Sequence, residues 1–193
     1  MSSSGVAGGG AATFLPSDSY KLSGVYETSY RDIALSIDNG FGPASGTLCL
    51  SAVAIPANFT IGHIAFLFSN GSTTLTNSWF ALYDNNRVML AQTADQLTAN
   101  YAANAVSSLA IAKVASGSAS TFTTTYSGLH YIGTVQAGSA RGSIFYTGNG
   151  STAFTQAPIL AGTSDTGLTT PTAFPHTAGA LTSTFRAYGY VAA

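Results

Sequence analysis

The three histidines are the residues best suited to metal binding or acid–base chemistry. They are His63, His130 and His176, and no two of them stand at the short spacing of a metal-binding motif. His63 and His130 fall in apolar runs typical of strands, whereas His176 follows Pro175 in a loop. Such positions are typical of ordinary half-buried histidines. The sequence therefore predicts no bound metal and no cofactor.

The acidic residues could support glycoside hydrolysis only if the fold brought two of them together. A glycosidase needs two carboxylates roughly 5–10 Å apart in a cleft. Asp32 and Asp38 flank an apolar stretch, whereas Asp84, Asp95 and Asp165 border turns. None of the seven Asp and Glu residues is clustered in the sequence. A hydrolase function would therefore require a close pair of carboxylates in a cleft.

Motifs for nucleophilic catalysis or phosphate binding are incomplete. A nucleophile elbow needs Gly-x-Ser-x-Gly, but residues 162–167, Gly-Thr-Ser-Asp-Thr-Gly, contain one residue too many. The glycine pairs within 40–42 and 148–150 lack the third glycine of a dinucleotide-binding loop. These pairs are typical of tight turns between strands, and we predict that the chain is not an enzyme.

Aromatic side chains offer a possible binding surface, because aromatic faces stack on sugar rings. The candidates for such a platform are Trp79, Tyr83, Tyr126, Tyr131 and Tyr146, although aromatic residues on strands more often lie in a core. Other aromatic and apolar residues lie near the N-terminus. The predicted assembly or ligand surface comprises Phe14, Leu15, Tyr20, Tyr26, Tyr30, Trp79 and Tyr83.

The elements that must position these residues are predicted to be short strands. Runs of β-branched, aromatic and threonine residues alternate with Gly, Asn and Ser clusters, at the spacing of a β-sandwich or barrel. The predicted strands are 47–55, 60–68, 77–83, 88–93, 106–112, 129–136, 143–146 and 181–191. Residues 93–105 are the one helical candidate, for which we expect a loop with at most one short helix. We predict an all-β, antiparallel, jelly-roll-like sandwich of about eight strands over residues 15–193, preceded by a Gly/Ala/Ser-rich arm over residues 1–14.

The turn Asp84-Asn85-Asn86-Arg87 predicts a hairpin with a two-residue type I′ loop, because asparagine tolerates positive φ. That register places Asp84 opposite Arg87 as a solvated clamp. It groups Phe80, Leu82, Met89 and Ala91 on one face of the hairpin, and Trp79, Tyr83, Val88 and Leu90 on the other. Both faces are apolar. We therefore expect each to be covered, either by another sheet and a loop or by a sister subunit.

Two local features of the remaining chain yield sharp predictions. The C-terminal run alternates with period two and carries Gly189 on one face, which predicts a close backbone approach or a bulge in a closing strand that returns into the sheet. Cys49 is the single cysteine and lies between two leucines, so it is expected to be a small buried hydrophobic residue.

Composition excludes several classes of protein. The 193 residues carry six Lys and Arg and seven Asp and Glu, giving a net charge of −1, whereas hydroxyls are abundant in 24 serines and 25 threonines. Six dispersed cations do not form a nucleic-acid-binding stripe. No run approaches the roughly 20 apolar residues of a membrane-spanning helix.

The first residues lack the basic and apolar regions of a secretory leader, and one cysteine suits synthesis in a reducing cytoplasm. So few charges suggest that partner subunits cover part of the surface, although hydroxyls could solvate it instead.

The hairpin and three other segments resemble virion proteins of tailed bacteriophages. The resemblance is carried by Trp79-Phe80-Ala81-Leu82-Tyr83-Asp84 with Leu90-Ala91-Gln92-Thr93-Ala94-Asp95-Gln96, and by residues 15–18, 126–133 and 158–168. These segments are similar to parts of β-sandwich virion proteins, which include minor tail, fibre-tip and head-decoration components.

This resemblance implies a non-enzymatic structural protein in the virion, made in the host cytoplasm. It implies a homo-oligomer, commonly a trimer, attached to capsid or tail proteins through the N-terminal arm. The alternative is a receptor- or carbohydrate-binding module at a tail or fibre tip, with a host surface glycan as its ligand. In neither case do we expect nucleic-acid binding or membrane insertion.

Overall fold

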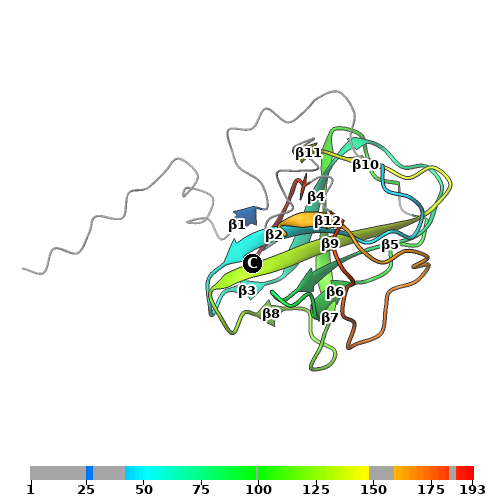
Figure 1. Ribbon diagram of the computed structural model, residues 1–193. Helices are drawn as coiled ribbons and strands as arrows, with labels where there is room; N and C mark the ends of the chain where they lie inside the picture. Colours follow the sequence, from blue (N-terminus) through cyan, green and yellow to red (C-terminus); the bar gives the residue numbers. More distant parts are fainter. Residues whose placement is uncertain (1–24, 28–41, 99, 148–158, 183–185) are drawn as a thin grey trace, which may run out of the picture.

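The computed structural model describes residues 25–27, 42–98, 100–147, 159–182 and 186–193. Every regular element among them is a β-strand, and all paired strands run antiparallel, which confirms the all-β prediction (Figure 1). The strands are β1 (Val25–Glu27), β2 (Cys49–Ile55), β3 (Thr60–Ile61), β4 (His63–Asn70), β5 (Leu75–Tyr83), β6 (Met89–Thr93), β7 (Ala105–Val114), β8 (Phe122–Thr123), β9 (Gly128–Gly138), β10 (Ser143–Ile144), β11 (Tyr146–Thr147), β12 (Ala161–Thr163), β13 (Arg186–Ala187) and β14 (Gly189–Ala192).

These described strands outnumber the predicted eight for two reasons. Three predicted strands are each divided by one residue: Gly62 divides 60–68 into β3 and β4, Phe145 divides 143–146 into β10 and β11, and Tyr188 divides 181–191 into β13 and β14. In addition, β1, β8 and β12 are short strands outside the predicted runs. The described residues of the predicted 93–105 connection form a loop without a helix.

The long sheet follows the order β1-β14-β4-β7-β6-β5-β9-β2-β12, with β10 beside β4. β7 serves both halves of this path. Its residues 105–110 pair with β4, whereas its residues 111–114 pair with β6 across a β-bulge. This order does not establish a jelly roll, and that part of the prediction stays a prediction.

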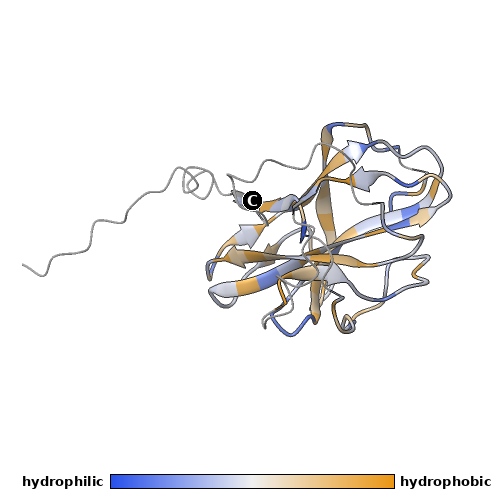
Figure 2. Ribbon diagram, turned by 45° about the horizontal axis from the view of Figure 1, so that its top comes forward, coloured by the Kyte–Doolittle hydropathy of each residue, from blue (hydrophilic) through white to orange (hydrophobic). Residues whose placement is uncertain are grey.

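The two halves of the sheet face each other across a main core, in a sandwich-like arrangement. The Phe66 ring on β4 meets the Phe80 ring on β5 edge to face, with 4.9 Å between centroids. β14 lies between β1 and β4, and an added Cβ at Gly189 would come within 2.6 Å of the Ala65 oxygen and 2.9 Å of Ile132. The predicted returning strand and its close approach at Gly189 are therefore confirmed. Figure 2 shows hydrophobic colours running along the strands.

Cys49 lies in the main core and is 1% exposed. Its thiol is free, and burial raises its pKa above the ordinary value. The prediction of a small buried hydrophobic residue is confirmed.

A second apolar cluster lies on the opposite face of β2, β5, β6 and β9. Its buried members include Leu48, Leu50, Trp79, Tyr83, Met89 and Tyr131. Residues 159–182, here called the strap, run across this face and contribute Leu160, Leu168, Phe174, Ala178 and Leu181 (Figure 1). Both faces of the β5–β6 hairpin are thus covered within the chain, one by the facing sheet and one by the strap.

The turn between β5 and β6 differs from the predicted type I′ loop. Asp84 and Val88 face each other through the Asp84 N–H to Val88 O bond of 2.9 Å, so the loop contains three residues and positive φ falls on Arg87, at 64°. The Asp84 carboxylate accepts hydrogen bonds from the amides of Asn86 (2.8 Å) and Val88 (2.7 Å). This side-chain cap favours a type I turn followed by a left-handed residue.

The added loop residue changes the hairpin register. Leu82 pairs with Ala91 and Tyr83 with Met89, across an irregularity between the two pairs. Met89 therefore joins the strap-covered cluster, and Leu90 packs against the main core, the reverse of the prediction. The predicted Asp84–Arg87 clamp was also wrong, because the Arg87 side chain donates to the Ala178 oxygen at 3.3 Å.

Candidate functional site

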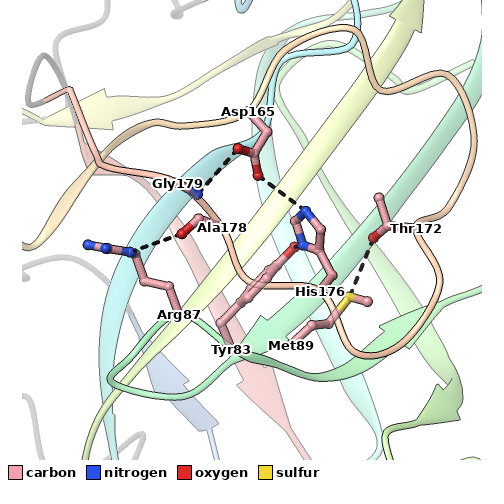
Figure 3. Close-up of polar contacts among 8 residues, drawn as sticks. All are labelled: Tyr83, Arg87, Met89, Asp165, Thr172, His176, Ala178 and Gly179. Carbon is pink, nitrogen blue, oxygen red and sulfur yellow. Dashed lines mark hydrogen bonds and ion pairs between the residues drawn. The ribbon is translucent and has the colours of Figure 1, made fainter.

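A cluster of polar side chains joins the strap to the β5–β6 hairpin (Figure 3). The Tyr83 hydroxyl lies 3.3 Å from His176 Nδ1, and His176 Nε2 lies 3.2 Å from Asp165 Oδ2. The other oxygen of Asp165 accepts from the Gly179 amide at 3.3 Å. We call Tyr83, Asp165 and His176 the latch. The strap supplies two of its members and the end of β5 supplies the third.

The surroundings of the latch keep the Tyr83 hydroxyl protonated. Tyr83 is 1% exposed, and both burial and the nearby Asp165 carboxylate raise the pKa of its hydroxyl above the ordinary value. The hydroxyl therefore keeps its proton, and in the tautomer that carries a proton on His176 Nε2, facing Asp165, it donates to Nδ1. The Nε2–Oδ2 contact is close but is not aligned as a hydrogen bond.

The latch resembles an acid–base–hydroxyl relay, but its hydroxyl is poorly placed for catalysis. A nucleophile must reach substrate and must lose its proton to the adjacent base. The Tyr83 oxygen is covered by the strap, and its raised pKa disfavours the phenolate. Both nitrogens of His176 already face partners within the chain. The geometry therefore fits a role in fastening the strap.

Main-chain contacts at the start of β6 support this role. The Met89 amide donates to the His176 oxygen at 2.8 Å, and the Ala178 amide donates to the Arg87 oxygen at 2.9 Å. Val88 and Thr177 thus form an antiparallel bridge, and the Thr172 hydroxyl lies 3.9 Å from the Met89 sulfur. Residues 176–178 thus extend the hydrogen-bonded ladder beside residues 87–89.

A second polar group lies at the start of β9. The Tyr126 ring stacks on His130 with centroids 4.3 Å apart, and its hydroxyl accepts from the Asn85 amide at 3.0 Å and donates to the Leu129 oxygen at 2.9 Å. His130 is 0% exposed, and its Nδ1 donates to the Gly128 oxygen at 3.1 Å. Burial lowers the pKa of His130 below its ordinary value, so its imidazole is held neutral.

The predicted assembly or ligand surface is corrected at two positions. Trp79 and Tyr83 are each 1% exposed and pack beneath the strap, so neither contributes to a surface. Tyr26 is half-buried, and its ring meets Phe59 with centroids 4.7 Å apart. Four predicted positions lie outside the described residues: Phe14, Leu15, Tyr20 and Tyr30.

The aromatic platform considered for sugars is not formed. Tyr131 is 3% exposed and donates to the Ile159 oxygen at 2.8 Å, and Tyr146 packs partly against the main core. With Trp79 and Tyr83 also buried, the core interpretation holds for these aromatics. Tyr126 is partly exposed, but both hydrogen bonds of its hydroxyl are internal.

The histidines and the acids within the described residues are likewise dispersed, whereas Asp32 and Asp38 lie outside those residues. His63 is exposed on β4, whereas the other two histidines serve separate contacts. Within the described parts of the chain, no group of three or more His, Cys, Asp or Glu residues could hold a metal ion. Asp95 is bound to the Ser78 amide at 2.9 Å and to the Asn77 side chain at 2.5 Å, which anchors the loop after β6.

Sequence reasoning missed the latch because its members are distant in the chain. His176 was assigned to a loop and Asp165 to a turn, but nothing in their spacing joins them to Tyr83. The available signal was the apolar outer face of the hairpin, which required a cover. That signal does not identify which segment provides the cover.

In the described residues there is no helix long and apolar enough to cross a lipid bilayer. Comparisons of the chain with protein-family models, with curated proteins and with solved structures found no match.

Proposed function

We propose that this chain is a non-enzymatic structural protein of a tailed-phage virion. In this role it is a capsid decoration, head-fibre or minor tail protein that forms a homo-oligomer, commonly a trimer. Residues 1–14 serve as the arm that attaches it to capsid or tail proteins. The proposal includes a jelly-roll-like strand arrangement and synthesis in the host cytoplasm.

The observation that carries this proposal is the scarcity of charge on an antiparallel sheet protein. Only 7% of the residues are charged, whereas a free domain commonly has about a quarter of its surface charged. β7 illustrates the result, since Val106, Ser108, Ala110 and Ala112 are exposed and uncharged, and Lys113 is the one exposed charged residue of this strand. Such a surface suits extended contacts between subunits.

The covered faces of the hairpin limit this argument to the outer surface. Since the strap shields one face and the facing sheet shields the other, those faces need no partner. Val106, at 46% exposed, and Leu97, at 64%, are the exposed large hydrophobic residues within the described ranges. The support for assembly therefore comes from neutral polar and small apolar side chains. The hairpin segments that carry the resemblance lie in β5, β6 and the loop after β6.

Two measurements test the proposal. Light scattering during size-exclusion chromatography gives the mass of the full chain and of a matched variant that lacks residues 1–14. We expect an oligomer in the first case. In a density map of the intact particle, copies of the fold should lie on the capsid or tail surface. A monomeric chain absent from the particle would refute the proposal, and binding to a glycan array by the isolated protein would favour the carbohydrate-binding alternative.

A further inference from the structure

The strap is fastened unequally along its length. Its first part is integrated into the sheet, because β12 pairs with β2 and the Ala52 amide donates to the Leu160 oxygen at 2.7 Å. The Leu48 amide also donates to the Asp165 oxygen, and the Ser164 amide returns a bond to Leu48, both at 2.9 Å. These contacts continue an existing ladder of main-chain hydrogen bonds.

Residues 166–179, here called the lid, are held differently. Asp165 precedes the lid and accepts from the Gly179 amide at its other end, so the two ends lie together (Figure 3). Beyond Leu168, which bonds Gly46 at 3.0 Å, no main-chain hydrogen bond is formed by the described residues 169–175. The far side of the lid rests on β6 through the two main-chain bonds at residues 176–178. A loop with adjoining ends can move without unfolding the segments that flank it.

The contacts that hold the lid on β6 are few. The His176 and Asp165 side chains are 17% and 31% exposed, and although Asp165 Oδ2 is itself buried, its contact with His176 is not aligned as a hydrogen bond. Tyr83 contributes one hydroxyl bond, and Phe174 and Ala178 contribute apolar contacts. Breaking this set exposes the fully buried Met89 side chain, the Met89 amide and the Arg87 oxygen.

We propose that residues 166–179 are a lid that opens as a unit from residues 87–89 at the start of β6, turning about its joined ends while the rest of the strap stays on the sheet. When closed, residues 176–178 cover the Met89 amide, the Arg87 oxygen and the Met89 side chain, which opening would expose to solvent. The latch sets the fraction of time that these groups are covered. This inference is independent of the proposed function.

Amide hydrogen exchange of the full chain tests the lid. The amides of Met89 and Ala178 report on its contact with β6, whereas those of Ala52 and Ser164 report on the fixed part of the strap. We expect the first pair to exchange at least about tenfold faster than the second pair, because local opening is easier than global unfolding. Equal exchange at all four amides would overturn the proposal.

A pair of matched variants separates the latch from general weakening. Tyr83→Phe removes the hydroxyl bond to His176, whereas Tyr131→Phe removes a similar bond to Ile159, outside the lid. The first should speed exchange at Met89 and Ala178 by about threefold to tenfold, the range expected for one hydrogen bond. The second should leave these two amides unchanged. Equal acceleration of all the reporter amides by Tyr83→Phe would show that the strap moves as one piece.

A covalent lock gives the opposite perturbation. Val88 and Thr177 are a non-hydrogen-bonded antiparallel pair, with the expected Cα separation of about 4.5 Å that suits a disulfide. In oxidised Val88→Cys/Thr177→Cys protein, exchange at Met89 and Ala178 should slow to the rate of the fixed part, and reduction should restore it. Unchanged rapid exchange in the oxidised protein would refute opening of the lid from residues 87–89.

Discussion

The Gln136 side chain makes two hydrogen bonds to main-chain groups that a neighbouring strand would otherwise make. Removing these bonds should lower the free energy of unfolding more than most single substitutions in this fold. Gln136 is 0% exposed on β9. Its Nε2 donates to the Gly142 oxygen at 3.0 Å, and its Oε1 accepts from the Gly142 amide at 2.8 Å. One side chain therefore satisfies both main-chain groups of a buried glycine in the connection from β9 to β10.

The substitution Gln136→Met keeps the length of the side chain but leaves both main-chain groups of Gly142 buried without partners. Each unsatisfied group costs about 1–3 kcal/mol, so the free energy of unfolding should fall by about 2–6 kcal/mol. Urea unfolding can be followed by the fluorescence of Trp79, the single tryptophan, which is 1% exposed.

The variant Gln136→Glu provides the matched control. One carboxylate oxygen can accept from the Gly142 amide, but the other faces the Gly142 oxygen and must carry a proton to bond it. Burial and this contact raise the pKa of the new carboxyl in the folded state above its unfolded value of about 4.3. Stability relative to wild type is then fully present below the unfolded pKa and is lost as pH rises through the folded pKa. A loss below about 1 kcal/mol in Gln136→Met, or a Gln136→Glu variant without this decline, would refute the reasoning.

Three further changes test other parts of the structure. Gly189→Ala places a Cβ 2.6 Å from the Ala65 oxygen and should destabilise the protein by about 1–3 kcal/mol in the same urea assay; an unchanged midpoint would contradict the close approach. The His130 imidazole is buried and neutral, so as pH falls the unfolded state takes up a proton at this side chain at a higher pH than the folded state does. Stability should therefore fall as pH drops from about 7.5 to about 5.5. The fall should be smaller in His130→Phe, and an equal fall in both proteins would exclude this histidine as the cause. Asp84→Ala removes both carboxylate bonds to turn amides, including that of Val88, and should cost about 1–2 kcal/mol, whereas Asp84→Asn should retain more stability.

The strand pattern could be predicted wherever a residue's environment is set by its own run of sequence. Cys49 lies between leucines in an apolar run and is buried as expected. Gly189 interrupts an alternating run and lies close to neighbouring main-chain and side-chain atoms, also as expected. β12 could not be found in this way, because Ala161-Gly162-Thr163 has no alternating pattern and is a strand only through the edge of β2.

The hairpin register shows how a side chain can override a turn preference. Two asparagines favour positive φ at the loop centre, but the Asp84 carboxylate captures two amides and moves positive φ to Arg87. One extra loop residue then transfers Met89 to the other face. The latch depends on that result, because residues 176–178 pair with residues 87–89. Its three members, up to 93 positions apart, therefore could not be joined by spacing alone.

β7 ties the fates of the two sheet halves together. Ile111 marks the crossover: its amide donates to the Gly62 oxygen in one half at 2.8 Å, while the residue itself pairs with Thr93 in the other. Because β7 pairs with a strand of each half, neither half can shift or unfold independently of the other. Heating should therefore yield one sharp transition, and damage near Ile111 should soften both halves at once.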